Sequence, residues 1–153
     1  MARKSFNEKL QDNQDLPRIV VLTDPKAIRR YKGARMLIAP ALFYDQVMRR
    51  VPEGRLLTSD DIRSHLARQQ GADFTCPLTA GIFINIAANA SAERGFDEIP
   101  WWRTLRKGGE LNEKYPGGIT AQQARLEAEG HTIIQKGKKA FVAHYEASLF
   151  KLD

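Results

Sequence analysis

The sequence predicts a mainly α-helical domain with small β elements, preceded by a short N-terminal α/β extension. Apolar residues recur at helical spacing over segments that begin near residues 41, 59 and 79, whereas the β-branched runs are short. A chain of 153 residues, 42% of them apolar and 27% charged, is long enough to fold alone around a core. We therefore expect one domain over 41–153 and an extension over 1–40 that packs on it.

Bulk composition limits the classes of partner and cofactor that we expect for this chain. The net charge of +6 and the pI near 9.6 favour an anionic partner such as nucleic acid. The single cysteine, Cys76, rules out an internal disulfide or a cysteine-based zinc cluster, and three scattered histidines offer no metal-ligand spacing, so we expect no metal and no cofactor. No apolar run approaches a membrane span and no secretory signal opens the chain, which predicts a cytoplasmic protein with no membrane partner.

The extension combines polar and strand-forming segments. Residues 1–16 are polar and mixed in charge, so we expect a loose arm. Residues 18–22 and 35–39 are apolar runs that predict two short strands. Between them, Asp24 followed by Pro25 predicts an N-cap and a helix through residue 31.

A helix is predicted from residue 41, with apolar side chains four residues apart on one face. Arg49 and Arg50 stand at its end. Either they lie in solvent, where they suit the helix dipole, or they contact the phosphates of a nucleic acid.

A helix-turn-helix is predicted next. The run 58–61 resembles a capping box, and Gly71 ends the helix that it opens. We expect Thr79 to cap the second helix. One predicted face of that helix carries Ile82, Phe83, Ile86 and Ala90, and the other carries Gly81, Asn85, Ala88 and Asn89. The small second face permits close approach either of DNA or of another helix.

Both tryptophans of the chain, Trp101 and Trp102, stand between Pro100 and Arg103. Either the indoles fill a core, or one stacks on a ligand ring while Arg103 holds an anion. Glycines at 108–109 and 117–118 bracket a loop that can form the wall of a nucleobase pocket. The end of the chain predicts a helix from Thr120 to Glu129, a hairpin turned at 136–137 and a short helix over 144–152.

Read together, several blocks carry a family resemblance over roughly residues 41 to 135. The blocks are 51–55, Asn89, 100–103, 108–109, 115–118 and 126–131. In their order and local sequence they resemble the C-terminal DNA-binding domain of O6-alkylguanine-DNA alkyltransferases. The resemblance implies a winged helix-turn-helix fold of the alkyltransferase type. Trp101 stands where that family has its methyl-accepting cysteine, as in the alkyltransferase-like proteins, which bind alkylated guanine in DNA without repairing it.

The resemblance also implies site residues. The lesion pocket would be formed by Trp101, Trp102, Arg103, Tyr115, Glu129 and Asn89. The DNA-binding residues would be Ser59, Arg63, Ala80, Gly81, Asn85, Arg49 and Arg50. Ser59 matches a tyrosine that rotates the phosphate in the family, and Ala80 matches its intercalating arginine, so both functions lack their usual side chain here. Phe74, in an insertion, can supply a substitute wedge.

The resemblance predicts a protein that is not an enzyme, because Trp101 and Trp102 replace the nucleophile and its base and only Glu129 remains. Cys76 is either a displaced nucleophile or a small core residue. The predicted function is recognition of O6-alkylguanine in double-stranded DNA and presentation to repair proteins, by a monomer. The alternatives are a winged-helix DNA-binding or protein-interaction module without lesion recognition and, third, an enzyme acting on a small nucleobase.

Overall fold

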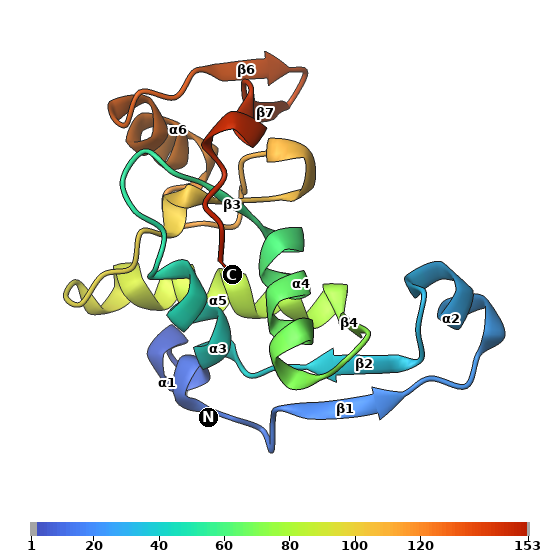
Figure 1. Cartoon of the computed structure of the whole chain (residues 1–153). Helices are drawn as coiled ribbons and strands as arrows, with labels where there is room; N and C mark the ends of the chain where they lie inside the picture. The colour runs from blue at the N-terminus through green and yellow to red at the C-terminus, as the bar shows by residue number, and fades with distance from the viewer. Residues whose placement is uncertain (1–2, 153) are drawn as a thin grey trace.

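The computed structural model describes residues 3–152 and is mostly helical with small sheets, as the sequence predicts (Figure 1). The α-helices are α1 (Phe6–Gln11), α2 (Pro25–Tyr31), α3 (Ala41–Met48), α4 (Ser59–Gln70), α5 (Pro77–Arg94) and α6 (Gly118–Ala128). The strands are β1 (Arg18–Val21), β2 (Arg35–Ile38), β3 (Leu57–Thr58), β4 (Phe74–Thr75), β5 (Thr104–Leu105), β6 (Ile133–Lys136) and β7 (Lys139–Val142). The 3-10 helices are η1 (Trp101–Arg103), η2 (Lys107–Gly109) and η3 (Tyr145–Ser148).

The strands form three small sheets. In the first, β2 pairs antiparallel with β1 and parallel with β4, so the extension and the later chain share one sheet. In the second, β3 and β5 pair in parallel and bring the start of α4 beside the tryptophan segment. The third is the β6–β7 hairpin.

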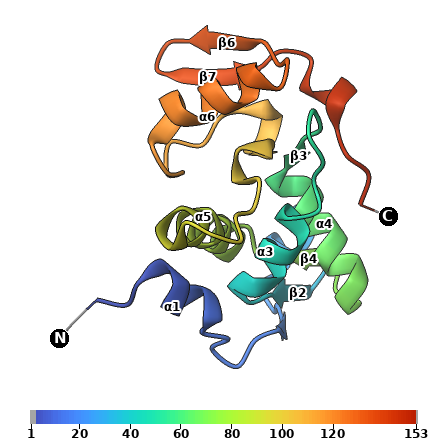
Figure 2. The same cartoon turned by 90° about the vertical axis from the view of Figure 1, so that its left-hand side faces the viewer.

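Helix α5 is the centre of the packing. It contacts α1, α3 and α4, and Figure 2 shows it between α1 on one side and α6 with the hairpin on the other. The buried residues along it are Ala80, Phe83, Ile84, Ala87, Ala88, Ala90 and Ser91. A helix surrounded in this way has only a narrow face left for a ligand.

The prediction of a loose arm over residues 1–16 is wrong for residues 3–16, and residues 1–2 lie outside the described part of the chain. Ser5 and Glu8 form a capping box that opens α1, and Leu10 is buried. The Glu93 carboxylate of α5 also accepts hydrogen bonds from the backbone N–H groups of Phe6 and Asn7. This long-range capping, which local periodicity cannot predict, fixes the segment on α5.

Several predicted helix ends are confirmed. The Asp24 side chain caps α2 by accepting from the Lys26 backbone N–H. Thr58 and Asp61 form the predicted capping box of α4, and Gly71 ends that helix in the left-handed conformation.

Other predicted ends differ. Helix α5 begins at Pro77 with Cys76 as its N-cap, rather than at Thr79, because proline is favoured in a first helical turn. Ile82, predicted to face inward, is exposed and Ala88 is buried, because α5 packs on its neighbours through Phe83, Ile84 and Ala87 instead. Helix α6 begins at Gly118, so Thr120 is not its cap, and the tail forms only the short η3.

Within residues 3–152, no helix is both long enough and apolar enough to cross a bilayer.

Candidate nucleic-acid interface

The exposed face of α5 begins with Leu78, Gly81 and Ile82. The Leu78 side chain is 73% exposed and that of Ile82 is 49% exposed, although both are large and apolar. A Cβ added at Gly81 would meet nothing within 4 Å, so the backbone is open to an approaching surface there. Ala80, in contrast, is 1% exposed and part of the core. The prediction that Ala80 contacts DNA is wrong, because its position on the helix faces inward.

A small hollow of about 90 Å³ opens beside this face. Four of the predicted site residues line it: Ser59, Gly81, Asn85 and Tyr115. The other four lining residues were not predicted from the sequence: Ile84, Leu105, Arg106 and Asn112. The hollow thus joins the start of α4, the first half of α5 and the loop after β5.

Tyr115 forms the aromatic wall of the hollow. Its side chain is buried, and its hydroxyl donates a hydrogen bond of 2.9 Å to the Thr104 carbonyl oxygen. Burial raises the pKa of the hydroxyl well above its ordinary value, so it stays protonated and remains a donor. The ring packs edge to face on Trp101, with 5.6 Å between centroids.

Asparagines tie the loop around Tyr115 to α5. The Asn112 side-chain amide donates to the Asn85 side-chain oxygen at 2.9 Å, and the Asn89 amide donates to the Lys114 carbonyl oxygen at 3.0 Å. The Asn112 backbone N–H donates to the Gln122 side-chain oxygen at 2.7 Å. Asn89, predicted in the lesion pocket, therefore holds the loop and is not among the residues that line the hollow.

Trp101 lies behind the wall. Its residue is 6% exposed, and its ring meets Trp102 at 5.5 Å as well as Tyr115. Neither indole is among the side chains that line the hollow. Of the two roles that the sequence leaves open for the pair, this geometry favours core packing, with Trp101 supporting Tyr115.

Trp102, Arg103 and Glu129 form a separate buried cluster. The Glu129 carboxylate accepts from the Trp102 indole N–H at 2.9 Å and from the Arg103 guanidinium at 2.7 Å. Arg103 also donates to the Val51 carbonyl oxygen at 2.8 Å, and the Gly54 N–H donates to Glu129 at 3.2 Å. Since this geometry uses the Arg103 guanidinium internally, the residue does not hold an anion in the hollow.

The electrostatics of the cluster favour ionised Glu129. Burial acts to raise the pKa of this carboxyl, but hydrogen bonds from Arg103, Trp102 and Gly54 outweigh it and hold the pKa below its ordinary value of 4.5. The Arg103 and Glu129 side chains are only 13% and 8% exposed. The cluster is therefore a charged and internally paired group at the edge of the core.

The predicted phosphate-binding arginines lie elsewhere. Arg49 forms ion pairs with Asp45 at 3.0 Å and Asp97 at 2.7 Å, and Arg50 donates to the Leu152 carbonyl oxygen. Arg63 pairs with Asp60. None of the three lines the hollow. The solvated helix end considered for Arg49 and Arg50 agrees with their positions, because both are exposed at the end of α3.

Arg106 is the functional candidate that sequence reasoning missed. It is half-buried at the hollow, on the loop that follows β5, and its charge acts on the Tyr115 hydroxyl. The sequence feature that could have indicated Arg106 is its position three residues after Arg103, at the end of a strand. Cys76, the N-cap of α5, is not among the lining residues.

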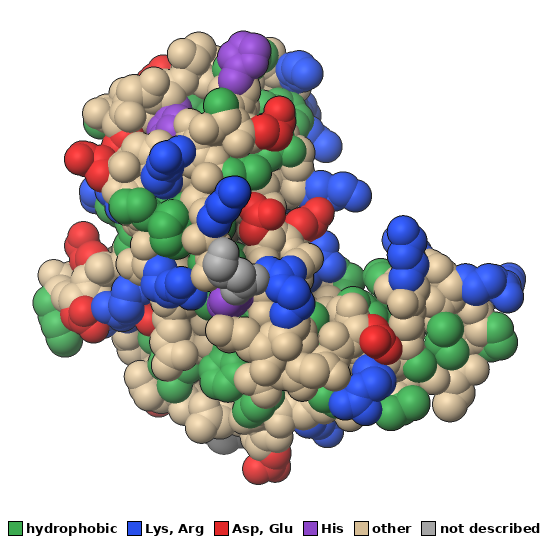
Figure 3. Space-filling model, viewed as in Figure 1, with side chains coloured by type: hydrophobic (Ala, Val, Ile, Leu, Met, Phe, Trp, Pro, Cys, Tyr) green, Lys and Arg blue, Asp and Glu red, His purple; other side chains and the backbone are tan. Residues whose placement is uncertain are grey.

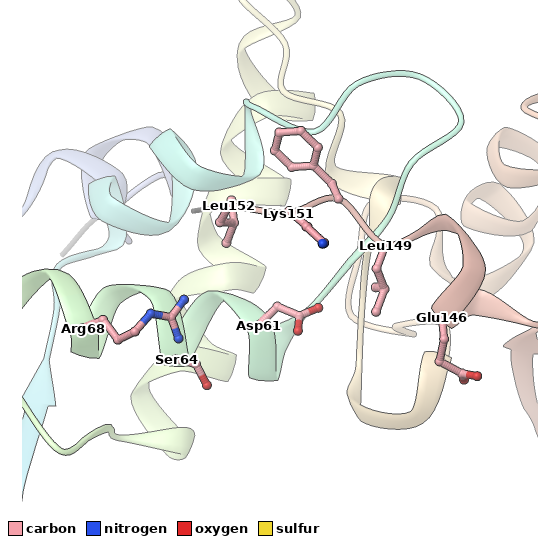
Figure 4. Close-up of a pocket in the computed structure, with 8 residues that line it drawn as sticks. Asp61, Ser64, Arg68, Glu146, Leu149, Lys151 and Leu152 are labelled. Atoms are coloured by element: carbon pink, nitrogen blue, oxygen red, sulfur yellow. The ribbon is translucent and has the colours of Figure 1, made fainter.

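A larger cavity of about 440 Å³ lies between α4 and the C-terminal tail (Figure 4). Asp61, Arg68, Glu146 and Lys151 line it together with apolar tail residues, so its charges are mixed. Of the predicted site residues, none lines this cavity. Within residues 3–152, no group of three or more acidic, histidine or cysteine side chains can hold a metal ion.

Comparison with known proteins gives a likeness of fold. The S. pombe ATL structure in complex with DNA is 20% identical, with a TM-score of 0.50, and the match covers 74% of this chain and 99% of that one. S. pombe Atl1 in complex with damaged DNA containing O6-carboxymethylguanine is 22% identical with a TM-score of 0.49 over the same shares. No family model matches the chain. No curated protein matches its sequence.

Proposed function

We propose that this protein binds duplex DNA through the exposed face of α5 and the hollow beside it. The observation that carries the proposal is that Gly81 and Asn85 belong to both the helix face and the hollow. An open glycine lets the helix backbone come close to a groove, and the basic net charge favours a polyanion. The S. pombe ATL structure that shares this fold is a complex with DNA, which supports the proposal.

In this proposal the fold is a winged helix-turn-helix. Helices α4 and α5 are its two helices, and the β6–β7 hairpin is its wing. The Leu111 N–H donates to the Ala140 carbonyl oxygen at 2.9 Å, which connects the wing to the loop around the hollow. Residues 1–40 form an extension on the domain 41–153, and the contact of α1 with α5 supports that division.

We further propose that the hollow receives an O6-alkylated guanine. Tyr115, backed by Trp101, supplies the aromatic surface that stacks on a base. As it stands, the hollow is smaller than the roughly 300–1,000 Å³ of typical small-molecule sites. A base therefore enters only when the half-buried Arg106 side chain swings out, where it can meet a phosphate.

Leu78 and Ile82 take the place of the arginine that intercalates in the family. Both are exposed, apolar and one helical turn apart, on either side of Gly81 in the chain. Leucine and isoleucine are among the side chains that proteins insert between base steps. Phe74, the wedge suggested by the sequence, is instead stacked on Tyr31 at 4.5 Å.

No chemistry on the lesion is proposed. The lining of the hollow holds neither a thiol nor an imidazole, which supports binding without alkyl transfer. Presentation of the bound DNA to repair proteins, a cytoplasmic location and a monomeric state stay predictions from the sequence.

The small volume of the hollow favours a second candidate. A helix-turn-helix module without lesion recognition would use the same α5 face and never open the hollow.

The two candidate functions are distinguished by measuring affinity for two matched duplexes, one with guanine and one with O6-methylguanine at its centre. Lesion recognition predicts tighter binding of the modified duplex, and Tyr115→Ala should remove that preference, since stacking on a base is worth about 1–3 kcal/mol. Equal affinity for both duplexes would favour the second candidate. Absence of binding to any DNA would contradict both.

A further inference from the structure

In the segment β1–α2–β2, residues 18–38, the α2 end projects from the rest of the molecule, whereas β2 pairs with β4 (Figure 1). We call this segment the basic lobe. It contains six lysines and arginines and one acidic residue, Asp24, so it carries +5 of the chain's net charge of +6. The six basic residues are Arg18, Lys26, Arg29, Arg30, Lys32 and Arg35, and all are exposed. The positive charge that favours a polyanion is therefore concentrated here and not around the hollow.

Helix α2 arranges part of this charge on one face. Lys26, Arg29 and Arg30 are three and four residues apart, so their side chains project from the same side of the helix. Within residues 3–152, no carboxylate lies within ion-pair distance of any of the three. The Asp24 carboxylate is engaged as the helix cap. The Arg30 guanidinium lies over the Tyr31 ring, 5.5 Å from its centroid. The face thus offers cationic groups that no carboxylate pairs, unlike Arg49, Arg63 and Arg103.

The basic lobe is fixed to the turn that leads into α5. Strand β2 pairs with β4, and Asp73 just before β4 accepts from the Arg35 N–H at 3.0 Å. Tyr31 at the end of α2 stacks on Phe74 of β4 with 9° between the ring planes. Gly33 lies so close to Asp73 that a Cβ would clash with it. The lobe therefore holds a defined position relative to the start of α5.

Figure 3 shows a notch between the basic lobe and the upper part of the molecule, with lysine and arginine side chains on both walls. By their place in Figure 1, the loop after β5 and the β6–β7 hairpin form the wall opposite the lobe. The exposed lysines of those segments are Lys107, Lys136, Lys138 and Lys139. The same loop supplies Arg106 to the hollow.

We propose that the basic lobe is a second DNA-binding site, which binds the phosphate backbone of the duplex beyond the start of α5. The proposal rests on the proposed DNA binding. It extends the DNA-contacting surface from the α5 face to a second site, which lies in the 1–40 extension. A duplex presents a negative charge about every 1.7 Å along its axis. A row of unpaired cations on a fixed lobe, facing other cations across a notch, fits such an elongated polyanion better than it fits a compact ligand.

The test compares two triple variants that remove equal charge. Lys26→Gln/Arg29→Gln/Arg30→Gln acts on the basic lobe. Arg3→Gln/Arg55→Gln/Lys151→Gln, at exposed positions outside the lobe, is the control. Affinity for an unmodified duplex long enough to pass the lobe is measured at several salt concentrations, after circular dichroism has shown that both variants are folded.

The lobe variant should bind at least about tenfold more weakly at low salt. Its slope of log affinity against log salt should become shallower by up to about 2.7, since each phosphate contact contributes about 0.9. The control should change much less. On a duplex trimmed to reach only the α5 face, the difference between the variants should vanish. Tyr31→Ala, which keeps every charge but removes the stack on Phe74, should lose part of the same affinity.

Equal losses in the two triple variants, with the wild type still binding DNA, would overturn the lobe proposal and leave the proposed function standing. A wild type that binds no duplex would contradict the proposed function itself. If that wild type bound anionic vesicles or an acidic peptide, and lost this binding in the lobe variant, the partner class proposed for the lobe would be wrong.

Discussion

In the tryptophan segment the polar groups have partners inside the molecule, whereas the α5 face leaves apolar side chains exposed to solvent. Around Glu129, charges and N–H groups are paired inside the molecule. Along α5, Leu78 and Ile82 are exposed and Gly81 meets no neighbour. Groups that are satisfied internally stabilise the fold, whereas exposed apolar groups beside an open backbone are free to meet a partner. The comparison gives the tryptophan segment a structural role and supports the proposal that α5 and its hollow bind the partner.

The largest expected effect is on stability. Arg103→Ala removes the main partner of the partly buried Glu129 carboxylate but leaves the Trp102 and Gly54 N–H donors, so it should cost about 1–3 kcal/mol in the free energy of unfolding. Chemical denaturation measures this loss. Arg55→Ala, at an exposed position, is the control and should change stability by less than about 0.5 kcal/mol. Equal stability of the two variants would show that the cluster is not structural.

A large effect on binding with little effect on stability is expected at Gly81. Gly81→Glu puts a side chain and a negative charge where DNA should approach, so affinity should fall at least about tenfold, because like charges facing each other cost several kcal/mol. Stability should rise by roughly 0.5 kcal/mol, since glutamate favours a helix more than glycine does. Ala128→Glu, exposed on α6, is the matched control. Unchanged affinity of Gly81→Glu would remove α5 from the interface.

A smaller effect should connect the two regions. Tyr115→Phe keeps the ring that faces the hollow and removes only the hydrogen bond to Thr104, so it should cost about 0.5–1.5 kcal/mol of stability. Preference for O6-methylguanine should persist in this variant, in contrast to Tyr115→Ala. Loss of the preference in Tyr115→Phe would mean that the hydroxyl, and not the ring, recognises the lesion.

The smallest expected effect is a pH dependence from Glu129. Its folded pKa lies below the unfolded value near 4.5, so its stabilising contribution is complete above that value and is lost as the pH falls through the folded pKa. Unfolding measured from pH 6 downward should show this loss in the wild type. The double variant Arg103→Leu/Glu129→Leu should lack that component. An identical acid profile in both proteins would contradict the assigned pairing.

Local signals in the sequence predicted much of the fold. The capping box at Thr58, the cap at Asp24 and the glycine stop at Gly71 depend only on nearby residues, and all three are confirmed. The start of α1 could not be predicted in this way, because Glu93, more than eighty residues away, completes it. Proline in the first turn moved the start of α5. The exposed face of that helix depends on its contacts with α1, α3 and α4, which local signals do not contain.

The candidate site was predicted only in part. Ser59, Gly81 and Asn85, predicted to bind DNA, line one hollow with Tyr115, which was predicted in the lesion pocket. Trp102, Arg103 and Glu129 were expected beside them, but their complementary donors and acceptors join one another instead. Motif matching indicates which residues are near one another, whereas the direction of each side chain depends on partners such as Val51 and Gly54.

The division between a supporting and a recognising region is tested most directly by NMR titration with the O6-methylguanine duplex. The chain has two indole N–H signals, from Trp101 and Trp102, and a distinct amide signal from Gly81. Our account predicts large shifts at Gly81 and Tyr115, a smaller shift at Trp101 behind Tyr115, and almost none at Trp102, whose N–H donates to Glu129. A shift that is largest at the Trp102 indole, with Gly81 unchanged, would contradict the account.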